Sequence, residues 1–248
     1  MTSVVLGHIP FALIGILVFG LPNLNGLSYI LASALLHFFY QIFLLNAYRF
    51  GELSVIYPTA RGLSPLIIFI ISLLFLEENV SFYDILGIFL ISFSLIIYGL
   101  KQYLNNSSSL KGFSLAIVTG CFIASYSIVD GYGARVTQNP IGFYSTMTLI
   151  NGLIFYFYAK WKDREIINRI FVNGKLSFFV GGTASYAAYS IVVWACLFLP
   201  IAVVSSIREN SILFAILLGI FFLKEKINLT KFFLIIGLFF GLVFLRFG

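Results

Sequence analysis

Long apolar stretches separated by short polar segments follow one another along this chain. A transmembrane helix needs about 20 apolar residues at a rise of about 1.5 Å per residue, and nine stretches come close to that length. Runs such as residues 64–76 are apolar on both alternating faces, unlike the strands of a membrane β-barrel. Helices are then the remaining structure that can span a bilayer. The pattern predicts an all-α integral membrane protein with helices over residues 4–21, 27–47, 55–76, 83–100, 112–130, 141–159, 176–198, 200–223 and 230–247.

The basic residues support nine crossings and give the chain an orientation. Eleven of the 15 Lys and Arg residues fall on the face that holds the N-terminus, and only Arg135 and Arg246 fall on the other face. The remaining two, Arg61 and Arg208, lie inside apolar stretches. Because Lys and Arg are enriched in cytoplasmic loops, we expect the N-terminus in the cytoplasm and the C-terminus outside.

A polar run at residues 105–109 divides the chain into two parts. We predict a first repeat of four helices at residues 1–104 and a second repeat of five helices at residues 112–248. The segments around Arg61 and Arg208 match without a gap at a constant offset of 147 positions, which also aligns Ser64 with Ser211 and Glu78 with Glu225. A repeat of five helices is odd-numbered, so two such repeats in tandem would have opposite orientations in the membrane. Secondary transporters with inverted repeats around a midplane site have this plan.

Composition agrees with a membrane protein and excludes other classes. The chain is 60% hydrophobic with 10% charged residues, where soluble domains have about 25% charged residues. The net charge of +6 does not indicate nucleic-acid binding, because the basic residues cluster between apolar stretches and form no nucleic-acid motif. Cys121 and Cys196 are interpreted as small packing residues. We expect no cofactor and no metal, and the partners expected are the lipid bilayer and a small-molecule substrate.

The two intramembrane arginines are the strongest candidates for a functional site. A charge at the centre of the hydrocarbon costs at least about 2.5–3.5 kcal/mol, so such residues usually face a cavity or a partner. Tyr57, Arg61 and Ser64 share one helix face, as do Ser205, Arg208 and Ser211 on the second helix. Prolines on the first face leave backbone carbonyls unpaired, which is tolerated beside a cavity. The predicted substrate contacts are Arg61, Arg208, Tyr57, Ser64, Ser205, Ser211, Gln41, Tyr126 and Tyr186, and the predicted structural or gating residues are Pro58, Pro65, Asp130 and Glu209.

The arginines have a second interpretation that stays open at this point. Each can form a structural ion pair, for example with Glu209 or Asp130, that fixes how the helices pack. Glu209 directly follows Arg208 and points about 100° away from it, which makes it a poor partner on the same helix. A substrate carboxylate would suit a guanidinium fork.

Other ionisable residues have simpler interpretations. For Asp130 we favour a helix-end or ion-pair role over proton coupling. His8 and His37 titrate near neutral pH in principle, but lone histidines are more often hydrogen-bonded packing residues, so neither is predicted as a proton carrier. Glu78 and Glu225 are interpreted as anchors at helix ends, and the basic residues 160–175 as a cytoplasmic loop.

Three segments resemble one transporter family. Residues 54–66, which read SVIYPTARGLSPL, resemble the fourth-helix motif of EamA-like members of the drug/metabolite transporter superfamily. Residues 206–211 and 223–226 resemble the ninth-helix partner of that motif, and residues 126–135 resemble the end of the sixth helix. The resemblance implies a ten-helix carrier in a bacterial cell membrane that moves small metabolites or drugs, often outward. Nothing in this chain corresponds to the first of those ten helices.

The function expected is therefore secondary transport by alternating access. No Gly-x-x-x-x-Gly-Lys loop is present, which argues against direct use of ATP. An integral membrane enzyme is the rival class, but Gly-x-Ser-x-Gly and His-Glu-x-x-His motifs are absent, so we predict no enzyme activity. A truncated or incomplete transporter, which needs its missing helix or a partner such as a second copy in a homodimer, is the other alternative.

Overall fold

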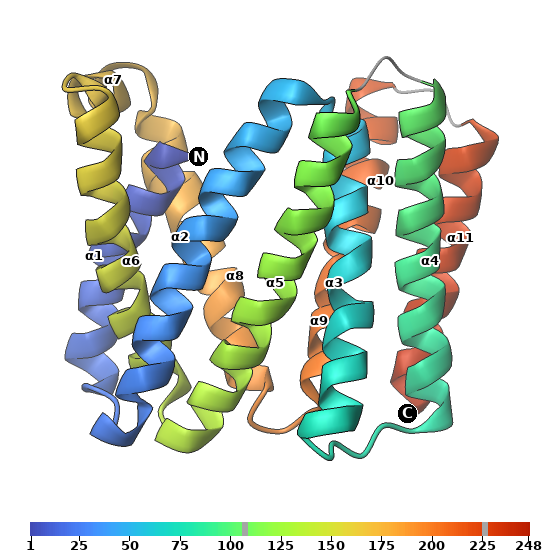
Figure 1. Cartoon of the computed structure of the whole chain (residues 1–248), viewed down its shortest axis with the longest axis horizontal. Helices are drawn as coiled ribbons and strands as arrows, with labels where there is room; N and C mark the ends of the chain where they lie inside the picture. Colours follow the sequence, from blue (N-terminus) through green and yellow to red (C-terminus); the bar gives the residue numbers. More distant parts are fainter. Residues whose placement is uncertain (106–108, 225–227) are drawn as a thin grey trace. The chain divides into compact units, whose positions relative to one another are not determined.

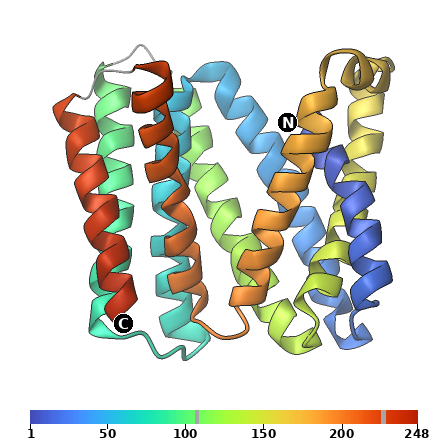
Figure 2. The same ribbon diagram turned by 180° about the vertical axis from the view of Figure 1, so that it is seen from behind.

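The computed structural model describes residues 1–105, 109–224 and 228–248, and every regular element in these ranges is helical (Figure 1 and Figure 2). Residues 106–108 of the predicted dividing segment and Glu225 lie outside the described residues. The helices are α1 (Thr2–Phe19), the 3₁₀ turn η1 (Leu24–Gly26), α2 (Leu27–Phe50), α3 (Leu53–Phe75), α4 (Phe82–Asn105), α5 (Leu110–Thr137), α6 (Pro140–Lys162), α7 (Ile166–Asn173), the π-helical turn η2 (Ser177–Gly181), α8 (Gly182–Ala195), α9 (Ile201–Glu209), α10 (Ser211–Leu223) and α11 (Leu229–Phe247).

The expectation of an all-α membrane protein is confirmed. Within the described ranges, eight helical segments are long and apolar enough to cross a membrane. The ninth predicted stretch, residues 141–159, does form a helix, α6, but this helix is not among the eight. Its polar residues include Ser145, Thr148 and Asn151. Eight segments therefore meet this criterion of length and composition, and the ninth predicted stretch is helical.

Two segments depart from the simple helices that the pattern predicts. The basic loop at residues 160–175 contains the short amphipathic helix α7. The stretch at residues 200–223 is divided into α9 and α10 at Asn210, whose backbone N–H donates to the carbonyl of Ile207 at 3.1 Å, three residues back. This 3₁₀-like turn directly follows Arg208 and Glu209, so it determines the direction in which their side chains leave the helix.

The chain folds into two compact units that do not follow the order of the sequence. The first unit comprises residues 1–39 and 128–198, and the second comprises residues 40–127 and 199–248. Helices α2 and α5 contribute residues to both units. In the first unit α1 packs against α6 and α8, and in the second unit α4 packs between α3 and α11 (Figure 1). The two predicted repeats are a statement about similarity between the halves of the chain. Contacts between helices do not test this similarity, so the repeats stay a prediction.

Small residues allow helices to approach closely inside each unit. In the first unit, a Cβ atom on Gly7 of α1 would lie 2.1 Å from the carbonyl oxygen of Phe178, so no side chain fits there. In the second unit, a Cβ atom on Gly87 of α4 would lie 2.8 Å from the carbonyl oxygen of Gly241 on α11. Close contact at small residues is typical of helices that associate in a bilayer, where van der Waals contact replaces the hydrophobic effect.

Candidate functional site

Arg61 and Glu209 form a buried ion pair in the second unit. Arg61 lies on α3, and its Nη1 is 3.1 Å from Oε1 of Glu209 at the end of α9. Its other terminal nitrogen, Nη2, donates to the hydroxyl of Tyr57 at 3.0 Å, one turn earlier on the same helix. The guanidinium also lies 5.1 Å from the centre of the Tyr57 ring. Tyr57 and Glu209 therefore hold Arg61 in one orientation, with each partner using a different terminal nitrogen.

Arg208 binds the same carboxylate oxygen. Its Nε and Nη2 lie 3.4 and 3.3 Å from Oε1 of Glu209. The expectation that adjacent residues on one helix are poor partners was wrong here, because two nitrogens of the long Arg208 side chain reach the carboxylate of its neighbour. One glutamate oxygen thus serves both of the arginines that the sequence singled out.

The cluster has an excess positive charge. Two guanidinium groups and one carboxylate leave a net charge of about +1, since arginine stays protonated in proteins. The Glu209 side chain is fully buried, whereas Arg61 and Arg208 are 19% and 11% exposed. The arginines are therefore more accessible than the glutamate.

Glu209 also has an acceptor that the described part of the chain does not use. Its Oε2 is buried and has no hydrogen-bond partner among the described residues, and the same holds for Oγ of Ser205 and Oδ1 of Asn210. Ser205 lies in the middle of α9, one turn before Glu209, and Glu209 and Asn210 lie at its end and in the turn that follows it. Buried acceptors without donors are costly and uncommon, so this helix end is polar beyond what its packing requires.

Ser64 and Pro65 have a local role that the sequence suggested only in part. Proline lacks an N–H group, so Pro65 deprives the carbonyl of Arg61 of its helical donor four residues later. The hydroxyl of Ser64 donates to this carbonyl at 3.3 Å. The carbonyl that was expected to be unpaired is therefore satisfied within the helix, and α3 continues through both Pro58 and Pro65.

The other predicted contacts in the second unit are distributed around α2, α5 and α9. Gln41 and Tyr126 are buried. The Tyr126 ring packs edge-on against the Tyr40 ring, with ring centres 5.3 Å apart. Ser205 is buried, whereas Ser211 is exposed. Of the predicted residues, the described hydrogen bonds and ion pairs join Arg61, Tyr57, Ser64, Arg208 and Glu209.

Asp130 and Tyr186 lie in the first unit, each with partners of its own. The Asp130 carboxylate accepts hydrogen bonds from Ser33 and, at 2.8 Å, from the hydroxyl of Tyr189. The hydroxyl of Tyr186 is 2.6 Å from the hydroxyl of Ser145. Sequence reasoning missed Ser33 and Ser145 as partners. Each lies on a helix far along the chain from the residue it contacts, and no spacing pattern reveals such a pairing.

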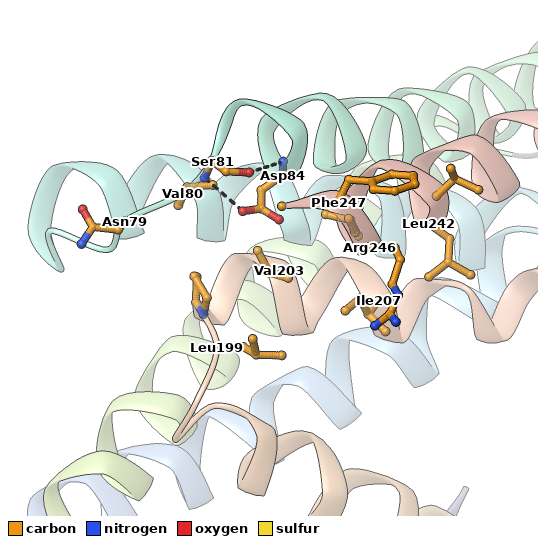
Figure 3. Close-up of a pocket in the computed structure, with 14 residues that line it drawn as sticks. Asn79, Val80, Ser81, Asp84, Leu199, Val203, Ile207, Leu242, Arg246 and Phe247 are labelled. Carbon is orange, nitrogen blue, oxygen red and sulfur yellow. Dashed lines mark hydrogen bonds between the residues drawn. The ribbon is translucent and has the colours of Figure 1, made fainter.

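A separate pocket lies at the ends of three helices of the second unit. It has a volume of about 1140 Å³ and is bounded by the start of α4, the start of α9 and the end of α11 (Figure 3). Ser81 and Asp84 exchange hydrogen bonds at the start of α4, and the side chain of Arg246 points toward Ile207 rather than toward Asp84 (Figure 3). None of the predicted site residues lines this pocket. We therefore place the candidate site at the arginine cluster.

Comparison with known proteins agrees with the motifs. A sequence model of the EamA-like transporter family matches residues 110–247, which is more than half of the chain. This match confirms the family and covers the segments at residues 126–135, 206–211 and 223–226, whereas residues 54–66 lie outside it. A search of the curated proteins gives no match.

Proposed function

The chain belongs to the EamA-like transporter family, and we propose that it is a secondary transporter that exports a small metabolite or drug-like compound by alternating access. It is a multi-pass membrane protein, and we propose the bacterial cell membrane as its location. The family is one of transporters, which supports a role without enzymatic chemistry. These proposals concern direction, mechanism and location, which family membership alone leaves open.

The observation that carries the proposal is the charge of the arginine cluster. Arg61 and Arg208 share one carboxylate oxygen, so the cluster has about one positive charge in excess in a buried setting. We infer that the substrate binds these arginines through a carboxylate or another anionic group, because a planar guanidinium binds such groups through two parallel hydrogen bonds.

The arrangement also suggests how the substrate would be exchanged. Arg61 comes from the first predicted repeat, whereas Arg208 and Glu209 come from the second. An ion pair between the repeats is a contact that movement of one repeat against the other would break. In our proposal the substrate anion replaces Glu209 as the partner of one arginine during transport, and Glu209 takes its place again after release.

A transport assay with a mixture of metabolites tests this proposal. The purified chain is placed in lipid vesicles loaded with the mixture, and compounds on both sides are measured by mass spectrometry. We expect a subset of anionic compounds to move, and to move faster when the same compound is present on the opposite side, which is the signature of a carrier. Movement of neutral and cationic compounds alone would contradict the anionic substrate. Absence of any movement from vesicles with folded protein would contradict the transporter itself.

A further inference from the structure

A second buried polar cluster lies in the first unit, and it shares no residue with the arginine cluster. Asp130 on α5 is 1% exposed. Its Oδ1 accepts from the hydroxyl of Ser33 on α2, and its Oδ2 accepts from the hydroxyl of Tyr189 on α8 at 2.8 Å. The same Oδ2 is 3.7 Å from Nε2 of His37, one turn after Ser33. Three helices thus bring two hydroxyls and an imidazole to one carboxylate.

The other ring nitrogen of His37 determines where its proton is. Nδ1 lies 3.1 Å from the backbone carbonyl oxygen of Ser33, and a carbonyl oxygen only accepts hydrogen bonds. Nδ1 is also 3.3 Å from the Ser33 hydroxyl, whose own proton goes to Asp130. Both contacts require a proton on Nδ1. In the neutral ring, Nε2 is then without a proton and presents its lone pair to Asp130.

This geometry makes the pair a site for one additional proton. If His37 is neutral and Asp130 is ionised, a nitrogen lone pair faces a carboxylate oxygen, which is repulsive. One proton between Nε2 and Oδ2 removes the repulsion, either as an imidazolium next to a carboxylate or as a carboxylic acid donating to the imidazole. The protonated pair has a favourable contact between α2 and α5, and the deprotonated pair does not.

Other titratable and charged groups surround this pair. His8 on α1 lies beside Tyr186, with ring centres 6.3 Å apart, and interacts electrostatically with His37. The ring of Tyr144 on α6 packs against the ring of Tyr189, with centres 5.1 Å apart. Arg135, further along α5, donates through Nε to the carbonyl of Cys196 at 2.7 Å. Nε2 of His37, at 3.7 Å from Oδ2, places a titratable base next to the Asp130 carboxylate.

We propose that Asp130 and His37 form the proton-binding site of the transporter, and that gain and loss of this proton are coupled to substrate movement. This inference rests on the proposed function. A proton enters from water on one side, binds the pair and is released to the other side, with no other bond made or broken. The coupling would act through α2 and α5, because these helices contribute residues both to the proton site and to the unit that contains the arginine cluster.

The proton site is tested without a substrate. The chain has two histidines, so ¹⁵N-histidine labelling of the full protein in lipid bilayers gives two ring systems, and His37→Gln assigns them. We expect His37 to have Nδ1 protonated at every pH and to gain a proton at Nε2 on acidification. In Asp130→Asn the proton affinity of His37 should fall by about tenfold or more, as expected on loss of a charge within about 4 Å.

Hydroxyl variants and a distant carboxylate provide the controls. Ser33→Ala and Tyr189→Phe each remove one donor from the carboxylate, so they should shift the midpoint opposite to Asp130→Asn, and they remain informative if that variant does not fold. Asp163→Asn, in the loop after α6, should leave the midpoint unchanged. An Nε2–H neutral tautomer in the wild type, or the same His37 midpoint in Asp130→Asn and wild type, would overturn the proton site.

Vesicle transport under an imposed pH gradient tests the coupling. We expect an inward proton gradient to accelerate export of the transported compound, and both Asp130→Asn and His37→Gln to abolish this acceleration. Transport that ignores the gradient would overturn the coupling while the proposed function stands. If no compound moves, the proposed function fails and the coupling with it, and the histidine spectra then decide separately whether the pair binds a proton.

Discussion

Replacement of Glu209 by glutamine should destabilise this protein more than replacement of either arginine. The variant keeps the size of the side chain and one carbonyl oxygen but removes the only negative charge of the described cluster. The charge of the cluster then rises from about +1 to about +2. By contrast, Arg61→Gln and Arg208→Gln each leave one arginine paired with Glu209 and a net charge near zero.

The contact distances set the size of the effect. At 3.1 and 3.3 Å, each arginine attracts the carboxylate by about 5 kcal/mol if the effective dielectric constant is about 20. The cost of removing all three groups from water offsets much of this attraction. Loss of one member of a buried pair usually costs about 3–5 kcal/mol, which we expect for Glu209→Gln. Either arginine variant mainly loses hydrogen bonds to the charged Glu209 carboxylate. Such a loss lowers the free energy of unfolding by about 1.5–3 kcal/mol.

The free energy of unfolding can be measured in mixed micelles with increasing amounts of a denaturing detergent. Glu77→Gln is the matched control, because Glu77 is exposed and should tolerate the same change. The double variant Arg61→Gln with Glu209→Gln should be more stable than Glu209→Gln alone, since it removes one of the two unbalanced cations. The reasoning is refuted if Glu209→Gln is as stable as the arginine variants, or if the double variant loses the sum of the single effects.

Two further predictions concern helix packing. The two carboxylate oxygens of Glu78 accept a hydrogen bond from the backbone N–H of Ile201, at 3.2 and 3.0 Å. Glu78→Ala should therefore lower the free energy of unfolding by about 1–2 kcal/mol, because α9 loses its N-terminal cap. An unchanged free energy of unfolding in the same titration would contradict this role. Gly7→Ala should cost about 1–3 kcal/mol because its methyl would overlap the Phe178 carbonyl, whereas Gly181→Ala, which meets only the side-chain end of Val4 at 3.1 Å, should cost less in a thermal melt. Equal melting temperatures for the two glycine variants would show that α1 and η2 can separate without penalty.

Most of the fold could be predicted because the bilayer reduces the choice of structures. An apolar run of about 20 residues has to be helical to satisfy its backbone, and all nine predicted stretches overlap helices. Residues 141–159 form the helix α6 as predicted, although α6 is not among the eight segments selected by length and composition. The prediction failed at Asn210, because neither a proline nor a glycine marks the turn between α9 and α10 in the sequence.

The candidate site was predicted in its residues but not in its pairing. Arg61 and Arg208 stand out because charge is expensive in hydrocarbon, and an ion pair with Glu209 was one of two open interpretations. One carboxylate serves both arginines because of how α3 packs against α9 and because the Arg208 side chain contacts its neighbour. Helix periodicity predicts neither of these features. The cluster at Asp130 was hidden for the same reason, since Ser33 and Tyr189 come from distant helices.

The measurement that tests the central claim most directly is vesicle transport by Arg61→Gln and Arg208→Gln next to the wild type, for any compound that the wild type moves. Lys162→Gln is the control, because this exposed lysine at the end of α6 lies over the ring of Tyr158 at 5.0 Å and takes no part in the cluster. The account predicts that both arginine variants insert and fold but lose transport, while Lys162→Gln retains it. Wild-type rates in both arginine variants would contradict the claim that these two residues form the substrate site.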